Sequence, residues 1–365
     1  MKLSIILLIN LLPVLLSCSG QNYNQKATET PNEPPHYLVI GDTVQELGNN
    51  IMVVFQGKNN TYWFGSWHDG LYSYDGKTIL HFNTKNGFPH NRIEEIKEDK
   101  SGNIYFNTSN GIIKFDGQKW TDLSTTISEG LWTLGQDDLW FKDGWDSEFI
   151  LRYDGKSLYK LKLPTTQIGE DYVSKHPNSP NPYSIYSIYN DSKGNVWFGT
   201  ATLGAFRFNG HTFEWISEED VTEIHDGPAN GVRSIIEDKD CYFWFNTMHR
   251  YKVYNIEDDS KQDIKKQKFY IREKGIGSLD EKIHGDLHEY LSIAKDNHNV
   301  LWIATYNSGV WQYDGKKVTH YDVQKGGKTI LLFSVYKDNM GTIWLGTQEN
   351  GVYKFNGTSF ERFIP

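Results

Sequence analysis

The stretch SIYSIYNDSKGNVWFGTATLGAFRFNGHTFEWI, residues 184–216, decides the fold of this chain. Four short runs rich in β-forming residues, at 184–189, 196–200, 205–208 and 212–216, predict four strands. Asp191 to Gly194 predicts a turn, because Asp caps nearby backbone and Gly accepts a positive φ. Asn209-Gly210 predicts a tight hairpin. One antiparallel sheet of this size is not stable alone in water, so it requires neighbours of its own kind.

The rest of the chain supplies those neighbours as repeats of the same pattern. We count seven repeats, at 51–82, 92–123, 130–163, 184–216, 231–273, 288–322 and 329–363. About 40–45 residues make one propeller blade, and seven blades lie within the usual range for a closed ring. We therefore predict an all-β fold, a seven-bladed β-propeller of four-stranded antiparallel blades over residues 37–365. Ring closure is expected through side-chain packing between the first and last blades.

A large ring recurs in the second strand of every repeat and is expected to fill the space between neighbouring blades. Where a Gly follows two residues later, as in Gly65, Gly199 and Gly346, it is expected to leave room for another backbone. The recurring aromatic residues are Trp63, Tyr105, Trp140, Trp197, Trp244, Trp302 and Trp344.

Charge and cysteine content exclude several classes of function. The 365-residue chain carries a formal net charge of −9 and has no basic block, which argues against a nucleic-acid partner. Its two cysteines, Cys18 and Cys241, provide neither a disulfide framework nor a Cys-based zinc site. A monomer is expected.

The N-terminus has the features of an export signal. Residues 1–17 combine Lys2 with a short apolar run, which is too short for a membrane span. The run ends in Leu15-Leu16-Ser17-Cys18, which resembles the bacterial lipoprotein signal. That resemblance implies cleavage before Cys18 and a lipid on its thiol; an ordinary secretory signal is the alternative. Residues 18–36 are polar and are expected to form a disordered tether. The expected location is the periplasm or the outer-membrane surface.

Three segments, EDKSGNIYFNTSNGIIKFDG, DSKGNVWFGT and DNMGTIWLGTQENGVYKFNG, resemble the two-component regulator propeller repeat. Propellers of that family form the periplasmic sensor part of hybrid histidine kinases or stand alone. The resemblance implies a propeller without catalytic motifs, here in a stand-alone lipoprotein form without kinase domains.

The two faces of such a propeller differ in sequence. If strands a to d run outward from the axis, one face carries the repeated Asp-Gly turns, and the other carries the variable b–c and d–a loops. Loops on a rigid scaffold are common binding sites, so we predict ligand binding on the b–c/d–a face. Its Trp residues are expected either to stack on sugar rings or to pack on the adjacent blade, and its Arg residues either to bind an anion or to form ion pairs. The predicted binding residues are Trp67, His68, Asp69, His90, Arg92, Trp145, Arg233, His249, Arg250, Tyr306 and Asn307.

We favour a non-catalytic binding or sensor propeller that recognises a small ligand, with glycans as one candidate, or a protein partner. No cofactor is expected. One alternative is a metal-dependent enzyme resembling streptogramin lyases, in which His284, Asp286 and His288 would hold a divalent cation, because alternate residues of an extended segment can point to one side. Another alternative is a periplasmic input component for a separate histidine kinase.

Overall fold

The computed structural model describes residues 36–128, 130–217, 231–245, 249–254, 269–276, 287 and 290–365. Within residues 184–216, the structure confirms the four expected strands to within one residue at each end. These are β15 (Ile185–Asn190), β16 (Val196–Thr200), β17 (Ala205–Phe208) and β18 (Phe213–Ile216), paired antiparallel in that order. The signal, Cys18 and the tether up to residue 35 lie outside the described residues, whereas His36, the last residue of the predicted tether, lies in a strand.

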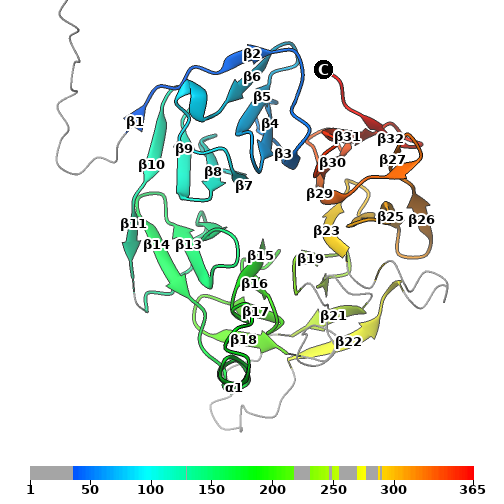
Figure 1. The fold of residues 1–365 in the computed structure, drawn as a ribbon. Coiled ribbons are helices and arrows are strands. Elements are labelled where there is room, and N and C mark those ends of the chain that lie inside the picture. The colour runs from blue at the N-terminus through cyan, green and yellow to red at the C-terminus, as the bar shows by residue number, and fades with distance from the viewer. Residues whose placement is uncertain are drawn as a thin grey trace, which may run out of the picture. The chain divides into compact units, whose positions relative to one another are not determined.

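Sheets of this kind are arranged around a common axis, with the first strand innermost in every repeat except the third (Figure 1). Two further sheets also contain four antiparallel strands. One is β19 (Ile236–Glu237), β20 (Tyr242–Trp244), β21 (His249–Val253) and β22 (Tyr270–Lys274), and the other is β23 (Tyr290–Lys295), β24 (Leu301–Thr305), β25 (Val310–Tyr313) and β26 (Val318–Tyr321).

Short segments outside the repeats add strands at the outer edges of two more sheets. The second repeat forms β7 (Ile93–Glu98), β8 (Ile104–Thr108), β9 (Gly111–Phe115) and β10 (Trp120–Leu123), with β1 (His36–Tyr37) added outside. The third repeat forms β12 (Leu139–Lys142), β13 (Phe149–Tyr153) and β14 (Leu158–Lys162), and β11 (Thr125–Ile127) pairs with β14 in parallel.

The prediction of seven separate four-stranded antiparallel blades is wrong. Five sheets stand as separate blades, whereas the first and last repeats are joined in one nine-stranded sheet by the backbone pairing Ile51↔Thr347. Two of the five separate sheets also depart from four antiparallel strands, as described above. The joined sheet consists of β2 (Asp42–Val44), β3 (Ile51–Gln56), β4 (Tyr62–Ser66), β5 (Leu71–Tyr74), β6 (Ile79–Phe82), β29 (Leu332–Lys337), β30 (Ile343–Thr347), β31 (Val352–Phe355) and β32 (Phe360–Arg362).

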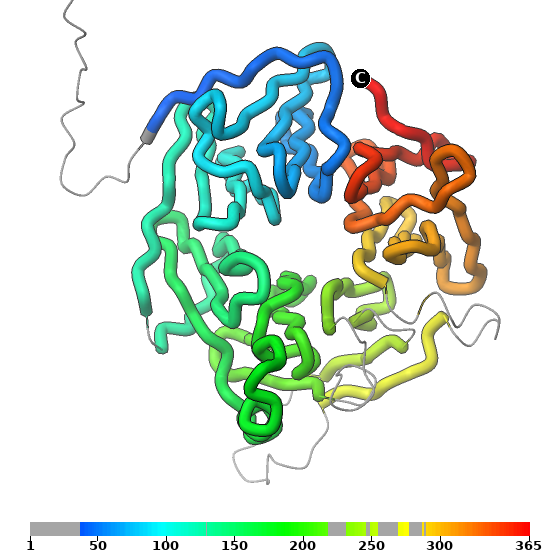
Figure 2. The backbone as a smooth tube through the Cα atoms, viewed as in Figure 1, coloured from blue at the N-terminus to red at the C-terminus, as the bar shows by residue number. Residues whose placement is uncertain are grey.

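Ring closure at this joint uses side chains as well as the backbone. The Tyr62 ring lies 5.0 Å from Trp344, and its hydroxyl donates to Asp338 at 2.8 Å. Ser334 donates to the backbone oxygen of Met52 at 2.7 Å. The tube in Figure 2 shows the blue segment of the first repeat beside the red C-terminal segment at this point.

The third repeat has no innermost strand, since residues 130–135 form none. Trp132 of this segment instead stacks on Trp140, with ring centroids 5.8 Å apart, and donates to the backbone oxygen of Lys162 at 3.1 Å. The segment therefore packs as a side-chain layer without joining the hydrogen-bonded ladder.

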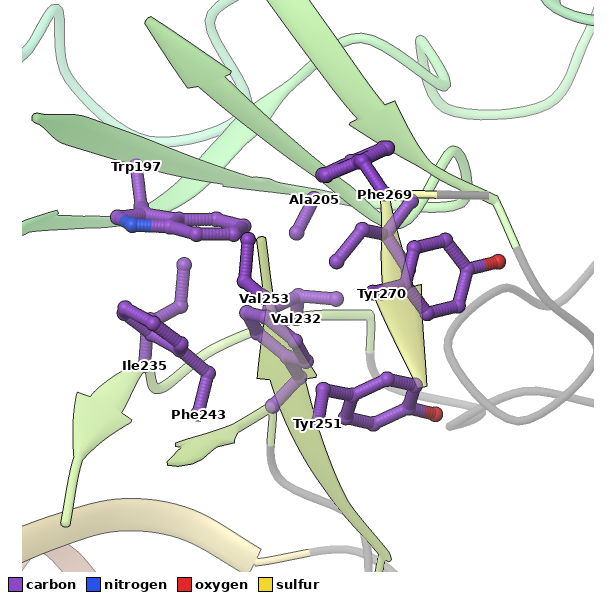
Figure 3. Packing of buried hydrophobic residues seen from close by; sticks show 11 residues of the cluster. Trp197, Ala205, Val232, Ile235, Phe243, Tyr251, Val253, Phe269 and Tyr270 are labelled. Atoms are coloured by element: carbon purple, nitrogen blue, oxygen red, sulfur yellow. The ribbon is translucent and has the colours of Figure 1, made fainter. Parts of the chain in front are cut away.

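Neighbouring repeats pack through the second-strand rings, as expected. Trp197 is fully buried and lies against Ile235, Phe243 and Val253 of the next repeat (Figure 3). A Cβ on Gly199 would lie 2.3 Å from the backbone oxygen of Val232, so only Gly allows this approach. The predicted role of Gly at this position is confirmed here.

An Asp at the a–b turn anchors the second-strand ring in five repeats. In the fourth repeat, Asp191 accepts the backbone N–H groups of Lys193 and Asn195, at 3.0 and 2.8 Å, and the indole N–H of Trp197 at 3.0 Å. The corresponding carboxylates are Asp99, which binds the hydroxyl of Tyr105, and Asp238, Asp296 and Asp338, which bind the indoles of Trp244, Trp302 and Trp344.

The remaining elements lie in connections. The helix α1 (Gln167–Lys175), capped by Thr166, lies at the outer side of the ring (Figure 1). A 3-10 helix, η1 (Thr84–Asn86), precedes β7, and a small hairpin, β27 (Gln324–Lys325) with β28 (Lys328–Thr329), precedes β29. No helix within the described residues is long and apolar enough to span a membrane.

Candidate functional site

A pocket of about 420 Å³ lies at the axis on the b–c/d–a face, and we call it the axial pocket. Six repeats contribute to it, which places it at the axis. The lining residues lie near the ends of the second strands of their repeats or near the starts of the first strands. Both positions are at the same end of the ring. The lining residues are Trp67, Lys142, Gly144, Trp145, Asp146, Ile185, Tyr186, Arg233, Leu291, Tyr306 and Phe333.

Aromatic side chains form most of the wall. Trp67 meets Trp145 edge to face, with centroids 5.0 Å apart, although the two residues belong to the first and third repeats. Phe333 lies 5.7 Å from Trp67 and 5.6 Å from Tyr306, both edge to face. Trp145 and Tyr306 remain 42% and 40% exposed. The pocket therefore presents accessible ring faces to a ligand.

Arg92 supports this wall without lining the pocket. Its guanidinium lies 4.5 Å from the Trp67 ring centroid and 5.8 Å from that of Trp145, within the range of cation–π attraction. Glu94 holds the guanidinium through an ion pair of 2.8 Å. The Glu94 side chain is 3% exposed, and burial raises its pKa, opposed by the nearby positive charges of Lys142 and Arg92. Arg92 thus fixes the indoles and has its own counter-ion.

A second Arg lies in the wall itself. The guanidinium of Arg233 stacks 4.3 Å from the Tyr186 centroid and 5.3 Å from Trp145. Asp146 accepts from the Tyr186 hydroxyl at 3.3 Å. Lys142, which is half-buried, makes no ion pair with any residue that the structure describes. Two cations and one carboxylate therefore line the pocket.

Seven lining residues are absent from the predicted binding set, and three of them, Tyr186, Leu291 and Phe333, share one position in their repeats. Each is the residue at which the pairing of a first strand shifts register, as between Ile185 and Ser187. Such a bulge re-aims a side chain, here toward the axis. Arg233 occupies the equivalent position, because Ile236 pairs with Trp244 as Tyr189 pairs with Trp197. An alignment of the repeats by this strand position, rather than by loops, would have identified them.

Of the predicted binding residues, the structure brings Trp67, Trp145, Arg233 and Tyr306 together in the axial pocket, with Arg92 behind it. Asn307 is exposed next to Tyr306 and does not line the pocket. His68 is exposed, and its backbone N–H donates to Ser66 at 3.1 Å.

Other predicted residues point elsewhere. Asp69 accepts from Tyr72 and lies 3.6 Å from His81 of the outer strand β6. Burial holds the pKa of His90 below its usual value, partly opposed by the charge of Asp122, and His90 does not line the axial pocket.

Arg250 lies in a different pocket, of about 340 Å³, lined by turn residues such as Asp238, Asp314 and Lys316. It pairs with Glu273 at 3.1 Å and lies 4.1 Å from the Tyr242 centroid. His249 is half-buried at the start of β21 and lines neither pocket. Arg250 is therefore not grouped with the axial residues.

His284, Asp286 and His288 lie outside the described residues. Within the described part of the chain, no group of three or more His, Cys, Asp or Glu residues is placed to hold a metal ion. The metal site stays a prediction.

Comparison with known proteins agrees with the repeat pattern. The family model for the two component regulator propeller matches residues 179–202. A histidine kinase of Formosa agariphila is 23% identical over 295 residues, which cover 76% of this chain and 20% of the kinase. This chain thus spans about a fifth of the length of that curated relative.

Among solved structures, the extracellular domain of a putative one-component system from B. thetaiotaomicron superimposes with a TM-score of 0.55 at 20% identity. The match covers 87% of this chain and 40% of that chain. Virginiamycin B lyase from Staphylococcus aureus gives a TM-score of 0.58 at 14% identity, covering 87% and 97% of the two chains. At these identities the structural matches establish the propeller fold. Together with the family match and the kinase relative, they confirm the resemblance of this chain to two-component regulator propellers.

Proposed function

We propose that this propeller is a non-catalytic binding module, and that its ligand is a small ring-bearing molecule held in the axial pocket. The observation that carries the proposal is the wall formed by Trp67, Trp145, Tyr186, Tyr306 and Phe333 around one pocket of about 420 Å³. Most ligand pockets have a few hundred Å³ of space, apolar walls and a small number of polar groups. A glycan fits this description, because sugar rings stack on indole faces.

The relatives favour an input role for such a module. Extracellular domains of two-component systems share its fold, and the curated relative is a histidine kinase. We therefore propose that ligand occupancy is reported to a histidine kinase. We also propose that the module faces the periplasm or cell surface, held by a lipid on Cys18. A Cys18→Ala variant should lose both the lipid and its sedimentation with membranes.

Binding is tested by titrating the full chain with cellotriose, maltotriose and trigalacturonate while recording tryptophan fluorescence and melting temperature. A ligand that binds only the folded state raises the melting temperature. Trp145→Ala should lower the affinity about fivefold, since a stacked ring typically contributes about 1 kcal/mol. Tyr254→Ala is the matched control, because Tyr254 is 41% exposed and lies outside the axial pocket. Saccharide binding that survives in Trp145→Ala and Trp67→Ala would contradict the proposed site.

A further inference from the structure

The second repeat supplies no residue to the lining of the axial pocket, among the residues that the structure describes, although each of the other six repeats supplies at least one. Its first strand has the same register shift as the strands that carry Tyr186 and Phe333, and Glu94 is the residue at the shift. The side chain of Glu94 is nevertheless only 3% exposed. The second repeat therefore has a buried carboxylate at the position where the fourth and seventh repeats present a ring to the pocket.

This carboxylate holds Arg92 against both indoles of the wall. Nε of Arg92 lies 2.8 Å from Oε1 of Glu94, and the guanidinium lies 4.5 Å from the Trp67 centroid and 5.8 Å from that of Trp145. Arg233 also lies near Trp145, but Arg92 is the only cation within this range of both rings in the described part of the chain. Because the two indoles come from the first and third repeats, Arg92 contacts the wall where it crosses the second.

From this geometry we infer, on the basis of the proposed function, that Arg92 is a positioning residue of the axial pocket. It lies behind the wall, and its charge, fixed by Glu94, keeps Trp67 and Trp145 edge to face, 5.0 Å apart. Trp145 is 42% exposed, so neighbouring atoms restrain only part of its surface, and the cation–π attraction of Arg92 adds to that restraint. A wall that is already ordered spares the ligand the entropic cost of immobilising two side chains.

Three variants of the full chain separate the positive charge from the packing of the Arg92 side chain. Arg92→Met combined with Glu94→Gln removes both charges, so that no buried carboxylate is left without its partner. Arg92→Lys keeps a positive charge at the same number of bonds from the backbone. Arg250→Met combined with Glu273→Gln is the matched control, because that ion pair, at 3.1 Å, lies beside Tyr242 in another pocket.

Two measurements are made on each variant. Fluorine NMR of protein labelled with 5-fluorotryptophan reports the surroundings of Trp67 and Trp145, whose resonances are assigned with Trp67→Phe and Trp145→Phe. Calorimetry measures the affinity for cellotriose, maltotriose and trigalacturonate.

We expect both indole resonances to move toward the shift of free 5-fluorotryptophan when the charges of Arg92 and Glu94 are removed together. The affinity for the saccharide that binds should fall about fivefold. Arg92→Lys should stay within about twofold of the wild-type affinity. The control at Arg250 and Glu273 should change neither measurement.

Unmoved resonances in the folded double variant of Arg92 and Glu94 overturn the inference, and so does an unchanged affinity. An equal loss in Arg92→Lys also overturns it, because a positive charge behind the rings would then not be what holds them. If the double variant does not fold, Arg92→Met alone takes its place, since Lys142 remains near Glu94 as a positive charge. If none of the three saccharides binds the wild type at about 10 mM, the proposed function fails, and the resonances alone decide whether Arg92 positions the indoles.

Discussion

The two ends of this propeller follow different rules. At the a–b turns, one device recurs: a carboxylate six residues before the second-strand ring holds both the turn and that ring, as Asp191 does for Trp197. At the b–c/d–a end a Thr that closes the second strand recurs in four repeats, as Thr200 donates to the backbone oxygen of Gly204 at 2.8 Å, but the residues that line the axial pocket differ between the six repeats that supply them. The difference teaches that uniform contacts stabilise the ring and irregular ones are free to recognise a ligand.

Two repeats lack this Asp and show what it contributes. The first repeat has Gly57 at the position of the Asp, and the third repeat has Leu134. The indole N–H groups of Trp63 and Trp140 are buried, and they have no hydrogen-bond partner among the described residues. A buried unpartnered donor costs about 1–3 kcal/mol, so these two repeats are expected to be weaker than the others.

The largest effect is expected from removing the carboxylate. Asp191→Ala leaves the turn N–H groups and the Trp197 indole without their acceptor, which should lower the free energy of unfolding by about 3 kcal/mol. Urea denaturation measures it. Lys193→Ala, at an exposed position of the same turn, should change stability by less than about 0.5 kcal/mol. Equal effects of the two substitutions would break the comparison.

A second prediction compares the rings. Trp197→Phe removes the indole N–H that donates to Asp191, so this carboxylate loses one hydrogen bond. Trp63→Phe removes an indole N–H that has no partner among the described residues. Both lose the same atoms, so the difference isolates the hydrogen bond. Trp197→Phe should be the more destabilising by about 1–2 kcal/mol. A larger loss for Trp63→Phe would mean that packing, not the anchor, separates the repeats.

The missing anchor can also be supplied. Gly57→Asp provides an acceptor for the Trp63 indole, and the Cβ it adds meets the flexible side chain of Asn59, at 2.9 Å, and no backbone atom closer than 3.7 Å. Gly57→Ala adds the same Cβ without the acceptor. We expect the Asp variant to be about 1 kcal/mol more stable than the Ala variant. Thermal unfolding of the two variants measures this difference. Equal stability of the two variants would mean that an Asp at this position does not anchor the ring of the first repeat.

The smallest expected effect is the loss of the Asp99 contribution to stability at acidic pH. Burial raises the pKa of Asp99, but hydrogen bonds from Asn103, Tyr105 and the turn backbone outweigh it and hold the pKa below its usual value. The stabilisation from Asp99 is therefore present above the unfolded-state pKa of about 3.9 and is lost as pH falls through the folded-state value. Asp99→Asn should be less stable than the wild type at pH 7, and the gap should narrow below pH 4. A gap that stays constant in acid denaturation curves would contradict this.

Sequence patterns predicted the regular parts of the molecule well. The Asn209-Gly210 hairpin, the second-strand rings and the approach at Gly199 follow from local chemistry, which repeats with the chain. Edges and joints were not predictable in this way. β11 and the Ile51↔Thr347 pairing depend on where segments far apart in the sequence meet. The local sequence of β11, Thr125–Ile127, does not indicate that it pairs with β14.

The candidate site was predicted in part for the same reason. Trp67 and Trp145 lie in loops whose sequences differ between repeats, so the sequence alone indicates them as binding candidates. Tyr186 and Phe333 stand inside strands, where an aromatic residue is expected for packing, and only the bulges turn them to the axis. Arg250 follows a b–c loop in the sequence, yet its side chain lies against Tyr242 in another pocket.

Stability and recognition are assigned to opposite ends of the ring. The most direct test of this separation measures the free energy of unfolding and the saccharide affinity of both Asp191→Ala and Trp145→Ala. We predict a crossed result, in which Asp191→Ala loses stability and keeps its affinity, while Trp145→Ala loses affinity and keeps most of its stability. If Trp145→Ala instead unfolds the protein as readily as Asp191→Ala and binds saccharides as the wild type does, the wall at the axis is structural and the account is contradicted.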